Sequence, residues 1–263
     1  MKSDPTAAQM LGVLREKADP SRVPVLQRFF RTQPGEYGEG DRFIGVTVPS
    51  VRRLSRRFRG AALDEIDALL HSPIHEARLL ALVLMVQAFR RAPEAGQRKI
   101  YKLYLSRTRW INSWDLVDSS APQIVGAWLA HRSRAPLWKL ARSRSLWERR
   151  IAIIATHHFI REGDLTETFA IAEMLLADEH DLIHKAVGWM LREAGKRDAA
   201  AERRFLARRA ARMPRTMLRY AIETFSERER RKYLRAAAGS GEVRAPTDAA
   251  LRRERSKEHR DTS

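Results

Sequence analysis

The chain has 263 residues, which suits one large domain or two small ones, and its hydrophobic fraction of 44% is enough for a sizeable core. Its 50 Lys and Arg against 32 Asp and Glu give a formal net charge of +18, so a phosphate-rich polymer is the expected partner. The lack of cysteine excludes disulfides and thiolate metal sites. Neither a signal peptide nor a run of about 18 apolar residues is present, so we expect a cytoplasmic protein without a membrane contact.

Apolar residues recur at helical spacing along nearly the whole chain, and this pattern predicts an all-α fold. Alternation typical of a strand is confined to residues 42–48. Helices are expected to begin near Thr6 and Arg22 and after Pro49. The later helices are expected at residues 63–70, 74–90, 96–105, 114–131, 136–142, 146–161, 165–176, 182–194, 199–212, 217–225 and 227–237.

Five of these helices carry a similar pair of small or apolar residues, here called the marker pairs. The marker pairs are Ala81-Leu82, Leu116-Val117, Ala152-Ile153, Ala186-Val187 and Ala221-Ile222. Successive pairs are 34 to 36 residues apart, a period typical of an α-solenoid with two helices in each unit. We therefore predict a single curved domain over residues 1–238, in which one helix of every pair lines a concave, basic groove.

The segment 239–263 differs from the rest of the chain. It is polar and lacks apolar periodicity, so we expect it to be disordered. From Gly241 onward it holds six basic and five acidic residues, a net charge of +1. The excess positive charge is therefore expected on the helical body, where it favours a basic groove over a basic arm.

The repeat register brings four unusual residues together. Trp114 and Arg150 each lie two places before a marker pair, so they occupy equivalent positions on adjacent helices. Asp118 lies on the same helix face as Trp114, and Trp189 follows the fourth marker pair. An unpaired carboxylate is costly in a core, whereas a carboxylate beside an indole suits a cationic ligand. Ordinary amphipathic helices would explain any one of these residues but not four in register, so we interpret them as a site.

Two other features of the sequence are only weak indications of a functional site. His180 and His184 are four residues apart and follow Glu179, a spacing that metal ligands use, but no third strong ligand accompanies them. The glycine-rich stretch at residues 35–40 lacks the Gly-Lys-Ser/Thr of a phosphate-binding loop and carries carboxylates, so we interpret it as an ordinary loop. No metal or cofactor is therefore expected.

Four stretches of the chain resemble the AlkD-type family of DNA alkylation repair glycosylases, which are built from HEAT-like helical repeats. Residues 113–118 (SWDLVD) are similar to its Trp-Asp-x-x-Asp stretch, and residues 146–153 (LWERRIAI) to its Trp-x-x-Arg-x-Ala-Ile helix. Residues 183–193 (IHKAVGWMLRE) resemble its most specific motif, Lys-Ala-Ile-Gly-Trp-x-Leu-Arg-Glu. Residues 43–53 (FIGVTVPSVRR) look like the turn into its third helix, and the whole resemblance spans residues 24–225.

The resemblance implies a monomeric DNA glycosylase that excises cationic N3- or N7-alkylated purines from double-stranded DNA in base excision repair. A carboxylate would stabilise the oxocarbenium-like sugar, and the base need not be flipped into a tight pocket. The matching catalytic positions are Asp118, Trp114, Trp189 and Arg150. Of these, Arg150 is expected to bind phosphate and to keep Asp118 ionised. The expected DNA-binding residues are Arg52, Arg192, Lys185, Arg149 and Arg219.

Departures from the family pattern leave other functions open. Ser113 stands where the family often has a second aromatic residue, and the insert at residues 35–41 occurs in related subgroups. Some relatives bind branched DNA without excision, so a non-catalytic protein that binds distorted or branched DNA is the second candidate. A protein-interaction scaffold is the third. Asp118 separates the first two, because a pure DNA-binding protein gains nothing from a carboxylate that faces phosphates, and salt dependence separates DNA binding from an apolar protein interface. The preferred lesion stays open.

Overall fold

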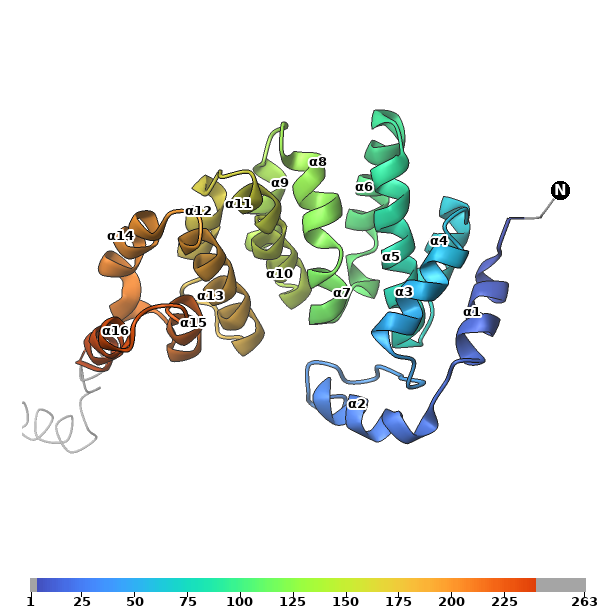
Figure 1. Ribbon diagram of the computed structural model, residues 1–263, viewed down its shortest axis with the longest axis horizontal. Coiled ribbons are helices and arrows are strands. Elements are labelled where there is room, and N and C mark those ends of the chain that lie inside the picture. Colours follow the sequence, from blue (N-terminus) through green and yellow to red (C-terminus); the bar gives the residue numbers. More distant parts are fainter. Residues whose placement is uncertain (1–3, 240–263) are drawn as a thin grey trace, which may run out of the picture.

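The computed structural model describes residues 4–239, which form a curved stack of α-helices with no strand among them (Figure 1). The first helices are α1 (Ala7–Arg15), α2 (Val23–Phe29), α3 (Val48–Arg57), α4 (Leu63–Leu70), α5 (His75–Arg91), α6 (Glu94–Ser106), α7 (Trp114–Asp118) and α8 (Ala127–Leu129). The stack continues with α9 (Ala135–Ala141), α10 (Leu146–Ala155), α11 (His157–Arg161), α12 (Thr166–Met174), α13 (Asp181–Gly195), α14 (Ala199–Arg209), α15 (Arg215–Ala221) and α16 (Glu227–Gly239). Short 3-10 helices lie at Pro20–Arg22, Thr108–Trp110 and Ala210–Arg212, and a π-helical turn lies at Pro122–Gly126.

One continuous row of helices carries the fold. Helices α5, α7, α10, α13 and α15 pack one against the next, and α4, α6, α9, α12 and α14 pack against members of this row. Each helix of the row carries one of the five marker pairs, the last of which ends one residue beyond α15 at Ile222, and all ten marker residues have 0% exposed surface. The prediction of an all-α, solenoid-like domain is therefore confirmed, and its marker pairs lie in the core between the packed helices.

Two glycines allow neighbouring elements of the stack to lie very close together. A Cβ atom at Gly188 in α13 would lie 2.4 Å from the carbonyl oxygen of Met217 in α15. A Cβ atom at Gly126 would lie 2.3 Å from the carbonyl oxygen of Ala155 in α10. Both distances are far below ordinary contact. A side chain at Gly188 would push α13 away from α15, and one at Gly126 would push the π-helical turn away from α10.

Two helices that the sequence predicts as single are broken, and the breaks have local causes. The predicted helix at 114–131 ends as α7 at Asp118. Pro122 lacks an N–H and its ring crowds the carbonyl four residues earlier, which is that of Asp118. The predicted helix at 146–161 is interrupted at Thr156, whose hydroxyl donates to the Ile153 carbonyl at 2.7 Å. The first break leaves α7 as a five-residue helix whose position depends on its tertiary contacts.

The strand-like segment at residues 42–48 forms no strand. Its ladder is limited to one isolated bridge between Arg42 and Ile74. The next amides, of Ile44 and Gly45, are taken up by a side chain, the carboxylate of Glu76 at the start of α5. Gly45 adopts a φ of +85°, which an L side chain rarely allows and which bends the segment out of an extended strand.

Helix α2 stands apart from the stack, below α3 on the hollow side of the arc (Figure 1). The chain returns from α2 to α3 through the turns of the glycine-rich stretch, so the interpretation of residues 35–40 as a loop holds. No helix within residues 4–239 is both long and apolar enough to cross a membrane. The predicted disordered tail lies outside the described residues apart from Gly239, the last residue of α16.

Candidate active site

The predicted catalytic residues line one cavity with a volume of about 440 Å³. Its lining includes Trp114, Asp118, Arg150 and Trp189, the four side chains that the sequence register brought together. They come from α7, α10 and α13, three successive helices of the central row. The opposite wall comes from α2 and the loop that follows it, which the repeat pattern did not predict.

A bidentate ion pair forms part of the wall of this cavity. Nε and Nη2 of Arg150 donate to the two carboxylate oxygens of Asp118 at 2.9 and 2.7 Å. Nη1 of Arg150 donates to the Leu182 carbonyl at 2.5 Å, which ties α10 to the first turn of α13. The Arg150 side chain is only 5% exposed. The geometry therefore favours a role for Arg150 in orienting Asp118 over the phosphate contact expected from the sequence.

Burial and the ion pair with Arg150 shift the pKa of Asp118 in opposite directions. Burial raises the pKa of its carboxyl above the ordinary value for aspartate, and the charge and hydrogen bonds of Arg150 partly oppose that rise. The side chain keeps 16% of its surface exposed, toward the cavity. Asp118 is thus a carboxylate held in a fixed direction that accepts a proton more readily than an aspartate in water.

Aromatic rings surround the ion pair. Trp114 stacks against Phe30 with ring centroids 5.3 Å apart and planes 11° from parallel, and Phe29 meets Trp114 edge-on at 5.8 Å. Trp189 donates its indole N–H to Glu193 at 3.2 Å and leaves part of its ring in the cavity wall. A flat apolar lining with a negative group beside it is suited to a planar cation.

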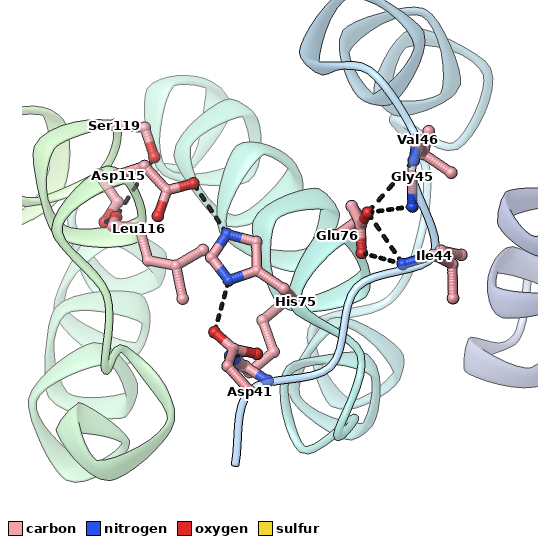
Figure 2. Close-up of polar contacts among 11 residues, drawn as sticks. Asp41, Ile44, Gly45, Val46, His75, Glu76, Asp115, Leu116 and Ser119 are labelled. Atoms are coloured by element: carbon pink, nitrogen blue, oxygen red, sulfur yellow. Dashed lines mark hydrogen bonds and ion pairs between the residues drawn. The ribbon is translucent and has the colours of Figure 1, made fainter. Parts of the chain in front are cut away.

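A second polar cluster fixes the other side of α7 (Figure 2). The ring nitrogens of His75 contact Asp41 at 2.7 Å and Asp115 at 2.9 Å. Because both partners are carboxylates and only accept, both nitrogens donate and the ring is an imidazolium. Burial lowers the pKa of His75, but the two carboxylates outweigh it and raise the pKa to about 9. Arg78 completes the cluster by donating to Asp41 at 2.8 Å.

The residue after His75 anchors the chain that leads into α3. The carboxylate of Glu76, 3% exposed, accepts from the backbone N–H groups of Ile44, Gly45 and Val46 (Figure 2). Sequence reasoning missed this cluster. Its signal is the group of charged residues His75, Glu76 and Arg78 at the start of a 17-residue helix that continues with the apolar run 79–86.

The predicted DNA-binding residues divide into two groups. Lys185 and Arg192 line the cavity beside Asp118. Arg52 on α3 and Arg219 on α15 are exposed but lie outside the cavity lining. The structure does not support a DNA contact for Arg149. Its Nε donates to Asp178 at 2.5 Å, and its Nη1 donates to backbone carbonyls. Adjacent residues on a helix point in different directions, so Arg149 points away from the cavity that Arg150 lines.

The histidines with metal-like spacing have structural partners. Nδ1 of His180 accepts from the Leu182 amide at 3.1 Å and so caps α13, and burial lowers the pKa of His180. His184 donates from Nε2 to the carbonyl of Asp178. Within residues 4–239, no three His, Asp or Glu side chains are grouped as metal ligands.

Comparison with known proteins gives the family of the chain and supports its fold. Residues 10–225 match the model of the DNA alkylation repair enzyme family, so the chain belongs to that family. A solved structure described as a predicted DNA alkylation repair enzyme from Enterococcus faecalis superposes with a TM-score of 0.63. It is 17% identical, covering 80% of this chain and 98% of its own, so it supports the shared fold alone. No curated protein matches the chain.

Proposed function

We propose that this member of the DNA alkylation repair enzyme family is a glycosylase that releases cationic N3- or N7-alkylated purines from duplex DNA. The observation that carries the proposal is the Asp118–Arg150 ion pair in an aromatic cavity. An alkylated purine of this kind is already a good leaving group, so the protein has to stabilise the positive charge that develops on the sugar. A carboxylate in a partly dehydrated site does this without reorganising during the reaction.

The reaction needs few groups. The bond between C1′ and the purine nitrogen breaks, and its electron pair leaves with the base and neutralises the cationic ring. Water adds to C1′, and its proton passes to the Asp118 carboxylate and then to solvent. Arg150 keeps the carboxylate aimed at one place, and burial raises the pKa of Asp118 toward that of an effective general base.

The cations around the site would hold the DNA backbone. Apart from Arg150, which is bound to Asp118, the lining has three basic side chains, Arg31, Lys185 and Arg192. Lys185 is also paired with Asp181, and Arg192 with Glu193 and Glu223, so phosphates would bind here in competition with these carboxylates. The first turn of α13, a 15-residue helix, also lies at the cavity, and a helix N-terminus favours phosphate. Exposed Arg52 and Arg219 would extend this contact along the duplex, with affinity that falls steeply as salt is added.

The test is a single-turnover assay on duplex DNA that contains one N7-methylguanine, with released base measured by cleavage of the abasic strand. Asp118→Asn should slow release about a hundredfold or more, since removing an electrostatic stabiliser typically costs about 3–4 kcal/mol. Its affinity for the duplex should stay the same or rise slightly. In the wild type, the rate should fall on acidification with a midpoint above the ordinary pKa of aspartate.

The chain offers a matched control for this variant. Asp67 accepts two hydrogen bonds from Arg107 at 2.8 Å each and its side chain is 17% exposed, close to the geometry and exposure of Asp118, but it lies outside the cavity. Asp67→Asn should keep the wild-type rate within a few-fold. A wild type that binds the duplex but releases no base would contradict the glycosylase and favour non-catalytic binding of distorted DNA.

A further inference from the structure

Helix α7, which carries Trp114 and Asp118, is too short to hold its own position. It has five residues, its N-cap Ser113 makes no side-chain hydrogen bond to the helix, and it ends at Asp118. A helix of little more than one turn is unstable by itself, because its nucleation is unfavourable and too few hydrogen bonds follow. The direction in which Asp118 faces the cavity is therefore set by the contacts of α7 with its neighbours.

Two carboxylates of α7 bind cations on the two adjacent helices of the row. Asp118, its last residue, binds Arg150 of α10 through both oxygens. Asp115, in its first turn, accepts from Nε2 of His75 at the start of α5 at 2.9 Å (Figure 2). The two residues between these carboxylates, 116–117, have no exposed surface. Helix α7 is thus held between two ion pairs, one at each end and each to a different helix.

The imidazolium of His75 is itself fixed on all sides. Its Nδ1 donates to Asp41, which also accepts from Arg78, and its ring stacks on Phe43 with centroids 4.5 Å apart. The side chain is 2% exposed, so it cannot turn away into water. The other oxygen of the Asp115 carboxylate is buried and has no hydrogen-bond partner among the described residues. The contact with His75 is therefore the one that orients Asp115.

The charge of Asp115 also acts on Asp118. The two carboxylates are three residues apart on one turn of helix, and like charges at that spacing oppose each other's ionisation. Burial raises the pKa of Asp118, the charge and hydrogen bonds of Arg150 lower it, and the charge of Asp115 raises it further. The imidazolium beside Asp115 offsets part of this repulsion, so the two ends of α7 are linked electrostatically as well as mechanically.

The remaining ionisable groups near Asp118 lie on other elements. Burial, and to a smaller extent the charge of Asp118, raises the pKa of Tyr104 on α6, so this phenol is neutral and adds no charge to the site. Across the open cavity lie Arg31, Tyr37, His180, Asp181, Lys185 and Arg192. All of these groups remain when Asp115 is replaced, so their effects on Asp118 cancel in a comparison with the wild type.

Resting on the glycosylase function proposed above, we infer that His75 and Asp115 are positioning residues of that reaction. The imidazolium on α5 holds the first turn of α7, so that the Asp118 carboxylate at the other end meets the sugar in one fixed direction. Neither residue lines the cavity, and both act through Asp118. The hydrogen bond between them sets the direction of Asp118, and the charge of Asp115 adjusts its basicity.

Two substitutions of Asp115 separate direction from charge in the single-turnover assay on N7-methylguanine. In Asp115→Asn the amide oxygen still accepts from His75, so α7 keeps its place and only the charge is lost. In Asp115→Ala both the hydrogen bond and the charge are lost. At neutral pH, Asp115→Ala should release the base about ten- to a hundredfold more slowly than wild type, and Asp115→Asn should stay within about threefold. A folded Asp115→Ala protein with the wild-type rate, or equal losses in both variants, would overturn the positioning role.

The pH profile gives a readout that a purely structural role would not move. The wild-type rate should fall on acidification as Asp118 is protonated, and Asp115→Asn removes a neighbouring negative charge, so its midpoint should lie about one unit lower. Asp41→Asn is the matched control, because it makes the same change at the opposite ring nitrogen of His75, away from α7 (Figure 2). Its midpoint should stay close to that of wild type. Equal shifts in both variants would overturn the role of the charge on Asp115.

A second measurement does not depend on catalysis. The carboxyl carbon of Asp118 can be titrated by NMR in the DNA-free protein, with its signal assigned by its loss in Asp118→Asn. In Asp115→Asn this carboxyl should titrate at lower pH than in wild type, by the same amount as the shift in the rate profile. An unchanged titration in an active protein would overturn the link between the two carboxylates and leave the glycosylase intact. A shifted titration in a wild type that releases no base would overturn the glycosylase and keep the link.

Discussion

The buried imidazolium of His75 gives a quantitative test of the structure. His75→Leu removes a ring that is 2% exposed and that donates to Asp41 and Asp115. Asp41 keeps its bond to Arg78, but Asp115 loses its partner on α5. Removing one partner of a buried ion pair costs about 3–5 kcal/mol, so the variant should be less stable by about that amount at pH 6.

The pH dependence of this loss follows from the pKa of His75. Its folded value of about 9 lies above the ordinary 6.5, so its contribution to stability is complete below about pH 6.5 and is lost as pH rises through 9. At 1.36 kcal/mol per unit, the difference of 2.5 units corresponds to about 3 kcal/mol. The gap in stability between wild type and His75→Leu should therefore shrink by about 3 kcal/mol between pH 6 and pH 10.

The assay is urea unfolding of both proteins at several pH values. The readout is the difference between their free energies of unfolding, plotted against pH. Titrating groups that do not contact the His75 ring contribute equally to both proteins and cancel in the difference, whereas Asp41 and Asp115 lose a partner in the variant. His131 is exposed, so His131→Leu serves as the control and should give a gap near zero at every pH. A constant gap for His75→Leu from pH 6 to pH 10 would refute the assignment of a charged ring to this position.

Two further variants test the packing and a second buried charge. Gly188→Ala should destabilise the protein by about 1–3 kcal/mol in thermal or urea unfolding, since its Cβ would collide with α15, whereas Gly12→Ala meets no atom within 4 Å and should be neutral or stabilising. Similar melting temperatures for both glycine variants would contradict the close approach of α13 and α15. Burial raises the pKa of Glu202 to about 8. The favourable contribution of its protonated form to the free energy of unfolding is therefore complete below the ordinary glutamate pKa and is lost as pH rises through 8. Glu202→Gln should therefore be more stable than wild type at pH 9, by on the order of a few kcal/mol, and equal stability there would show that Glu202 is already ionised below neutral pH.

The sequence alone was enough to predict the helices of the stack and the side of the cavity that α7, α10 and α13 form. A helix period and a repeat of 34 to 36 residues are local properties, because each unit must bury the same face against its neighbours. This register alone placed Trp114 and Arg150 on adjacent helices and Asp118 near both, and the structure joins Asp118 to Arg150 at hydrogen-bond distance. The same reasoning could not orient Arg149, whose neighbour on the helix took the inward direction.

Only the tertiary structure shows which segments lie opposite these site residues and which contacts hold α7 in place. Asp41, His75 and Asp115 are 34 and 40 residues apart, and no period links the loop that carries Asp41 to the helices that carry the other two. Tyr37, in the loop after α2, likewise reaches Trp147 and His180 from outside the repeat. Amphipathic patterns record which face of a helix is buried, but they do not record which segment covers it. That choice follows from the packing angles and the curvature of the whole stack, so it appears only when the helices are assembled.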